Sequence, residues 1–128
     1  LVNDSISIVF LKDPTDPKWA KDATLKLYRS IMKRYAAGAN VNDAYHVYGM
    51  AVAWTTVELL RKLGKDLTRE RLVAALSAMS FAKNPFLLPG IAVKTGKSDH
   101  FPIEQMLLQR WANGSWRSFG GIWTQRAS

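Results

Sequence analysis

The chain has 128 residues, a hydrophobic content of 48% and a formal net charge of +8 from 18 basic and 10 acidic side chains. This length and composition predict one globular unit with a real core and argue against a disordered chain. The absence of cysteine excludes a disulfide framework and a cysteine-ligated metal site. The positive charge permits an acidic partner, but the basic residues are spread along the polar sides of predicted helices, which favours a solvated surface.

The first predicted element is a strand at residues 5–11, "SISIVFL", because this stretch is rich in β-branched residues. Two Asp-Pro pairs then break the extended backbone. Asp16 before Pro17 can cap a helix that has proline at its first position. Apolar residues spaced by three to four predict that this helix extends over Lys18–Tyr35.

The second predicted helix is capped by Asn42 or Asp43, continues to Leu63 and ends at Gly64. Its apolar residues occupy almost every side, a pattern typical of a helix buried between two other layers. The rest of the chain offers few elements to supply both layers. The apolar run at Ala44–Val57 is too short and too polar to span a bilayer.

A third helix is predicted after Thr68, with Leu72, Val73, Leu76 and Met79 facing inward. Residues 81–90 contain two prolines and a glycine and are predicted to form a loop. A complete β unit follows: a short strand at 90–95, a polar turn, an alternating strand at 103–111 and a returning strand at 115–123. Asn113-Gly114 between the last two strands is a strong hairpin signal.

The sequence offers little for catalysis or metal binding. The histidines, His46 and His100, are too far apart for a helical metal-binding motif, and neither a nucleophile elbow nor a complete phosphate loop occurs. The glutamates are isolated along the chain, so no pair of carboxylates is set up for acid–base chemistry. We therefore expect no enzyme activity, no metal and no cofactor.

The aromatic residues are more informative. Tyr45 and Tyr48 lie one turn apart at the start of the second helix, where they could cover a small organic ligand or pack in the core. The tryptophans are interpreted as packing residues; they include Trp54, Trp111, Trp116 and Trp123. The "RW" and "WR" pairs around the hairpin give a weak version of an aromatic and basic platform for single-stranded nucleic acid.

Several stretches together resemble a known family. They are the tyrosine-containing helix after "ND" at 42–43, "GKDLTRE" at 64–70, "LLPGI" at 87–91 and "SDHFPIEQMLLQR" at 98–110. The pattern covers nearly all of residues 5–123 and resembles the C-terminal third of the periplasmic solute-binding proteins of ABC importers, of the branched-chain amino acid type. The chain is then expected to be a single fragment, residues 1–128, of a larger protein.

The resemblance implies a two-lobed α/β fold with parallel sheets and a ligand cleft between the lobes. Residues 1–86 would supply a strand and three main helices of the first lobe. Residues 87–128 would supply a crossing strand and a terminal antiparallel β hairpin of the second lobe. The protein would bind a small solute, an amino acid or an aromatic carboxylate, in the periplasm, and the closed form would dock on the membrane subunits of an ABC permease.

The family position at the start of the second helix maps onto Tyr45, and helical geometry adds Tyr48. Most family contacts to the ligand come from regions that precede this stretch, so the fragment is expected to be incomplete for binding and to self-associate through exposed edges. Two alternatives remain open. One is a ligand-sensing domain of a signalling protein with the same fold; the other is a small basic nucleic-acid-binding domain, whose binding would weaken steeply with salt.

Overall fold

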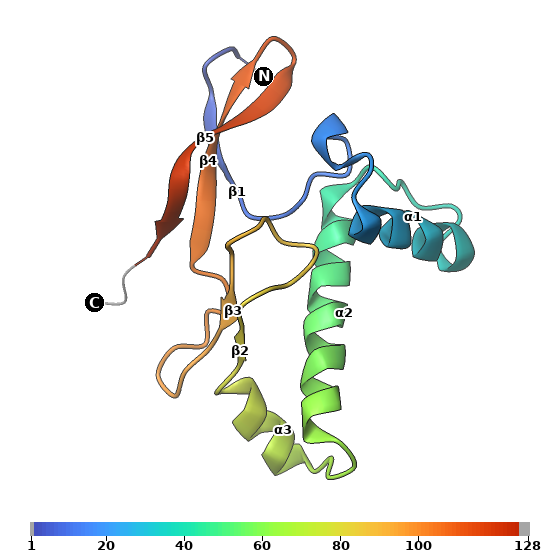
Figure 1. The fold of residues 1–128 in the computed structure, drawn as a ribbon, viewed down its shortest axis with the longest axis vertical. Helices are drawn as coiled ribbons and strands as arrows, with labels where there is room; N and C mark the ends of the chain where they lie inside the picture. The colour runs from blue at the N-terminus through green and yellow to red at the C-terminus, as the bar shows by residue number, and fades with distance from the viewer. Residues whose placement is uncertain (1, 126–128) are drawn as a thin grey trace.

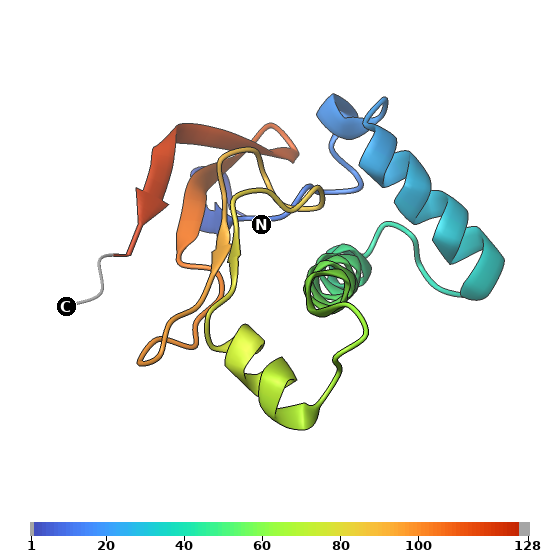
Figure 2. The ribbon, with the colours of Figure 1, turned by 60° about the horizontal axis from the view of Figure 1, so that its bottom comes forward.

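The computed structural model describes residues 2–125 and shows a mixed α/β fold (Figure 1). The helices in this part of the chain are a short 3-10 helix, η1 (Pro17–Trp19), and the α-helices α1 (Ala23–Tyr35), α2 (Ala44–Leu63) and α3 (Arg69–Leu76). The strands are β1 (Ile6–Val9), β2 (Ser80–Phe81), β3 (Val93–Lys94), β4 (Gln105–Ala112) and β5 (Ser115–Thr124). Both views place the strands on one side of the molecule and the helices on the other (Figures 1 and 2).

All strand pairs within residues 2–125 are antiparallel. Three strands form one sheet in the order β1-β4-β5, and β2 and β3 form a separate two-stranded sheet. The terminal antiparallel β unit is therefore confirmed, but the parallel sheets that the resemblance implies are not among these pairs. Residues 1–86 and 87–128 meet in both sheets, because β1 pairs with β4 and β2 pairs with β3. The division of the chain into two lobes stays a prediction.

The caps of α2 and α3 are those that the sequence predicts. The Asp43 side chain accepts a hydrogen bond from the Tyr45 N–H at 2.9 Å, and α2 ends at Gly64, which has a φ of 64°. The Thr68 hydroxyl accepts from the Arg71 N–H at 3.3 Å. Local hydrogen bonding therefore fixes where these two helices begin.

The prediction of one continuous helix over Lys18–Tyr35 is wrong. Asp16 caps only η1, and the chain turns before α1 begins at Ala23. Asp22 caps α1, because its carboxylate accepts hydrogen bonds from the N–H groups of Thr24 and Leu25, both at 3.0 Å. A second capping aspartate thus restarts the helix in a new direction.

The core lies between α1, α2 and the loop that connects the two β-strands of the smaller sheet. Its most deeply buried large side chains are Leu25, Tyr28, Val47, Leu87 and Ile91. The Tyr28 hydroxyl donates a hydrogen bond to the Val41 carbonyl at 2.9 Å, and burial raises the pKa of that hydroxyl. The predicted loop at 81–90 thus contributes much of the core, and its first residue belongs to β2.

Two predictions about burial are wrong. Only Val47, Ala51 and Leu59 of α2 are buried, while Val52 on the same side of the helix and Val57 and Leu60 on the opposite side are exposed. In α3, Val73 and Leu76 are also exposed, although Leu72 is partly buried; α3 ends at Leu76, so Met79 joins the core from the segment after the helix. The helices carry the predicted apolar residues, but residues 2–125 provide a cover for only one side of them.

The hairpin between β4 and β5 confirms the Asn-Gly signal. Asn113 and Gly114 have φ angles of 52° and 77°, which suit a tight hairpin turn. Trp111 and Trp116 face each other across the hairpin with ring centroids 5.4 Å apart, and Trp54 packs edge-on against Phe81. Trp123 is 62% exposed, so its interpretation as a packing residue is wrong.

Candidate functional site

A pocket of about 590 Å³ lies between the end of β1, the start of α2 and the β4–β5 hairpin. Both tyrosines named from the sequence, Tyr45 and Tyr48, line it. The other lining residues are Ile8, Val9, Phe10, Leu11, Asp13, Ala44, Gln109 and Trp116. Three segments that are far apart in the sequence therefore build one pocket, and the predicted ligand-binding pair lies on one wall of it.

The geometry of the two tyrosines follows from the start of α2. The Asp43 cap sets the first turn of the helix, so that Tyr45 and Tyr48 lie on the same side, one turn apart. Tyr45 is 84% exposed and contributes an accessible ring and hydroxyl to the pocket. Tyr48 is held edge-on against Phe10, with ring centroids 6.3 Å apart. One ring is thus fixed by packing and the other is accessible.

The polar groups of this pocket are few. The Asp13 carboxylate already accepts hydrogen bonds from the Thr15 N–H and hydroxyl, both at 2.7 Å. The Gln109 side chain donates to the Ile8 carbonyl at 3.5 Å, which is the long limit of a hydrogen bond. An apolar, aromatic pocket with a small number of polar groups is typical of small-molecule sites. Gln109 and the Tyr45 hydroxyl are the groups best placed to orient a ligand.

A buried ion pair anchors the segment that forms one side of the pocket. Lys12 lies between two lining residues; its Nζ is 2.7 Å from Oδ2 of Asp22, and its N–H donates to the Phe86 carbonyl at 3.0 Å. Burial acts to raise the pKa of Asp22. Hydrogen bonds from Lys12 and from the backbone N–H groups of Leu25 and Thr24, together with the positive charge of Lys12, act to lower it. The lowering effects are larger, so the pKa of Asp22 lies below its usual value. The pair fixes the end of β1 relative to α1.

Of the ten lining residues only Tyr45 and Tyr48 were predicted to bind a ligand; the aromatic and amide side chains that the prediction missed are Phe10, Gln109 and Trp116, the last interpreted as a packing residue. Gln109 did carry a signal, because it is a polar residue on the side of β4 that also holds Leu107 and Trp111. Phe10 and Trp116 carried none beyond being aromatic. Their role depends on the pairing of β1 with β4, which brings the two ends of the chain together.

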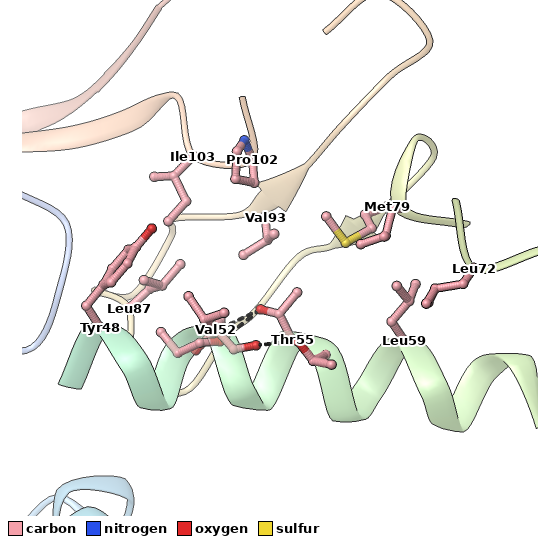
Figure 3. A pocket seen from close by; sticks show the side chains of 14 residues that line it. Tyr48, Val52, Thr55, Leu59, Leu72, Met79, Leu87, Val93, Pro102 and Ile103 are labelled. Atoms are coloured by element: carbon pink, nitrogen blue, oxygen red, sulfur yellow. Dashed lines mark hydrogen bonds between the residues drawn. The ribbon is translucent and has the colours of Figure 1, made fainter. Parts of the chain in front are cut away.

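A second cavity, a groove of about 290 Å³, lies between α2, α3 and the smaller sheet (Figure 3). Side chains of α2, among them Val52, Thr55 and Leu59, face Val93, Pro102 and Ile103 across it. We call it the α2–α3 groove.

Most polar groups of the α2–α3 groove are already paired; the exception among its lining residues is the hydroxyl of Tyr48, which lines this groove as well as the pocket at Tyr45. The Asn84 amide donates to the Ala51 carbonyl at 2.9 Å and to the Thr55 hydroxyl at 3.1 Å. The groove therefore offers a ligand apolar contact but little orientation by hydrogen bonds. The pocket at Tyr45 is the better candidate site.

Within residues 2–125, no group of three or more His, Asp or Glu side chains is arranged to hold a metal ion. In the same part of the chain, no helix has the length and apolar character needed to cross a membrane.

Comparison with known proteins adds no assignment. No family model matches the chain, and neither a curated protein nor a solved structure matches it. The functional argument therefore depends on the residues and the pocket that they form.

Proposed function

We propose that this chain is the C-terminal part of a two-lobed periplasmic solute-binding protein that delivers a small solute to an ABC permease. The observation that carries the proposal is the composition of the pocket. Tyr45 and Tyr48 come from the part of the chain that the resemblance assigns to the first lobe, and Gln109 and Trp116 come from the part that it assigns to the second. A pocket built from both parts is where a cleft between lobes would lie.

The chemistry of the pocket favours an amino acid or an aromatic carboxylate as the solute. Its volume of about 590 Å³ is within the usual range for small-molecule sites. The rings of Phe10, Tyr45, Tyr48 and Trp116 supply flat apolar contact, and Gln109 supplies a donor and an acceptor. The lining residues include no nucleophile with an adjacent base, which supports binding without chemistry.

The large exposed surface supports a place in a larger assembly. The chain exposes 9063 Å², about 2,200 Å² more than the roughly 6,800 Å² expected of a compact monomer of 14.4 kDa. Part of the excess is the α2–α3 groove and the exposed side of α2. A helix that is apolar on two sides and covered on one is expected where further polypeptide packs against it.

A thermal-shift screen of the gene product that contains this chain tests the proposal. The panel holds branched-chain and aromatic amino acids, benzoates and short polar amides. A solute that binds only the folded protein raises its melting temperature by mass action. We expect a rise with one class, its loss in Tyr45→Ala, and its retention in Tyr35→Ala, which removes another exposed tyrosine outside the pocket.

No rise with any solute, or an equal rise in Tyr45→Ala, would contradict the proposed site. The same screen bears on the ligand-sensing alternative, which predicts solute binding without docking on a permease.

The nucleic-acid alternative has one structural observation in its favour. Arg110 and Arg117 lie on the same face of the β4–β5 hairpin as Phe119, and the Arg110 guanidinium is 5.4 Å from the Phe119 ring centroid. Aliphatic residues make up most of the rest of that face, and they do not stack on bases. This alternative predicts that the chain binds single-stranded nucleic acid. It also predicts that the logarithm of the binding constant falls steeply as the logarithm of the salt concentration rises.

A further inference from the structure

Within residues 2–125, one face of the three-stranded sheet does not pack against the core. Directly paired residues in neighbouring strands point to the same face, so the register places Ile8, Leu108 and Phe119 together on it. The apolar residues of this outer face are Ile6, Ile8, Met106, Leu108, Phe119 and Trp123. Arg110 and Arg117, which pair with each other, lie at the hairpin end, and Trp123 lies at the opposite end of the sheet.

The two faces of the sheet differ in what they pack against: Met106, Leu108 and Phe119 on the outer face are half-buried, as Val9 and Leu107 on the inner face are, but only the inner pair contacts the core. Val9 and Leu107, on the inner face, pack against the hydrophobic core, whereas none of the six outer-face residues belongs to that core. Ile6 is 57% exposed and Ile8 is 51% exposed, in addition to the exposed Trp123. An apolar face of a sheet is normally buried against another layer of secondary structure, so the outer face is expected to have a partner.

We propose that the outer face packs against the same face of a second copy of this chain. Each partner of a standard interface buries about 800 Å². The chain as a whole exposes about 2,200 Å² more than a compact monomer of 14.4 kDa, and the outer face, with its exposed Ile6, Ile8 and Trp123, shares this excess with the α2–α3 groove and the exposed side of α2. Two identical sheets that pack face to face form a sandwich, and a two-fold axis makes the contact self-complementary. The inference is independent of the proposed function, because none of the residues it depends on except Ile8 lines the solute pocket.

The positions of the arginines select one orientation. With the two-fold axis perpendicular to the strands, Arg110 and Arg117 of one copy lie over the end that holds Trp123 in the other. A guanidinium over an indole is a favourable pairing. With the axis parallel to the strands, four arginines would meet at one end, and the Asp4 carboxylate 3.3 Å from each Arg110 would offset only part of their repulsion. The antiparallel arrangement is therefore the one that the charges favour.

Sedimentation velocity of the 128-residue chain over a micromolar to submillimolar range tests the proposal. We expect a species of twice the 14.4 kDa monomer mass. Ile8→Lys should raise the dimer dissociation constant at least ~10-fold, which corresponds to ~1.4 kcal/mol. Leu27→Lys is the matched control, since it adds the same charge at a residue of α1 that is 55% exposed, and it should leave the dimer intact.

The pair Trp123→Lys and Trp123→Glu tests the orientation. In the antiparallel arrangement position 123 faces arginines, so Trp123→Lys should weaken the dimer much more than Trp123→Glu. In the parallel arrangement position 123 faces itself, and both variants should weaken it equally. A monomer at every concentration would overturn the proposal. A dimer that persists in Ile8→Lys but dissociates in Val52→Lys would also overturn it, because Val52 lies at the α2–α3 groove.

Discussion

The pair formed by Lys12 and Asp22 shows how much structure a single contact can fix. Lys12 is buried, its Nζ lies 2.7 Å from the Asp22 carboxylate, and it is also 5.0 Å from the centroid of the Trp19 ring. Asp22 in turn caps α1. One carboxylate therefore begins a helix and neutralises a buried charge at the end of β1. Removing it leaves the lysine buried and unpaired; because the pair is only partly buried, we expect a cost below the ~3 kcal/mol of a fully buried ion pair.

The lowered pKa of Asp22 gives this contact a pH dependence. A carboxyl whose pKa is lower in the folded state stabilises the protein above its unfolded pKa, and that contribution is lost as the pH falls through the folded value. We expect Asp22→Asn to lower the free energy of unfolding at neutral pH, with a difference from the original chain that shrinks below about pH 4. Urea unfolding at a series of pH values measures this.

Asp66→Asn is the control for that experiment, because Asp66 pairs with Arg71 on the surface and should change stability by less than about 1 kcal/mol. A stability difference for Asp22→Asn that stays constant down to about pH 2.5 would show that the ionised carboxylate is not the source of the effect.

Residue-scale features of this kind were only partly predictable. Asp43, Gly64, Thr68 and the Asn113-Gly114 turn all follow from the sequence, because caps and turns depend on hydrogen bonds to neighbours in the chain. The Lys12–Asp22 contact was not predicted, nor was the role of Asp22 as the cap of α1. The predicted cap, Asp16, has the same side chain a few residues earlier, and the local pattern does not distinguish the two.

At the scale of elements, the contact of β5 with the loop at 81–90 depends on one glycine. Gly90 has a φ of 91°, and a Cβ at this position would lie 2.6 Å from Cδ1 of Ile122. The backbone conformation therefore favours glycine, whereas the Ile122 methyl group is the end of a flexible, 38% exposed side chain and can turn aside. This contact joins the β4–β5 hairpin to the segment that carries the buried Leu87 and Leu88.

We expect Gly90→Ala to destabilise the protein by roughly 1–3 kcal/mol in denaturant unfolding, mainly because alanine is strained in a left-handed conformation; the contact with the flexible Ile122 side chain adds less. Gly38→Ala is the matched control, because a Cβ at position 38 would meet no heavy atom within 4 Å and the φ of Gly38 is not left-handed. It should change stability by less than about 0.5 kcal/mol. Adding Ile122→Ala to Gly90→Ala should recover only the part of the lost stability that is due to steric overlap. Full recovery of the free energy of unfolding would show that the backbone conformation contributes nothing.

The extent of a helix such as α2 was predictable from the sequence, whereas its burial was not. The extent of α2 follows from its caps and its apolar content, and the structure has it at Ala44–Leu63. Its burial depends on which other elements are present to cover it, and residues 2–125 cover one side only. Helical spacing predicts that the two tyrosines at its start lie beside each other, but the pocket around them needs β1 and β4 to pair.

At the scale of the whole molecule, the order β1-β4-β5 could not be predicted from any local pattern, because it joins the two ends of the chain. That pairing determines both surfaces on which our proposals depend. It brings Gln109 and Trp116 to the tyrosines on the inner face, and it gathers Ile6, Ile8 and Leu108 on the outer face. A binding pocket and a contact between copies can therefore coexist on opposite sides of one sheet.

A dimer of this chain should also show in its thermal stability. Association of folded copies stabilises them by mass action, so the melting temperature should rise with protein concentration, whereas that of a monomer does not. Each copy carries a formal charge of +8, so the copies repel each other at long range and added salt should strengthen the dimer by screening this repulsion. Scanning calorimetry over about a hundredfold range of concentration, at low and moderate salt, measures both effects. Ile8→Lys should remove the dependence on concentration, and Leu27→Lys should keep it. A melting temperature that does not change with dilution would mean that the outer face stays open in solution.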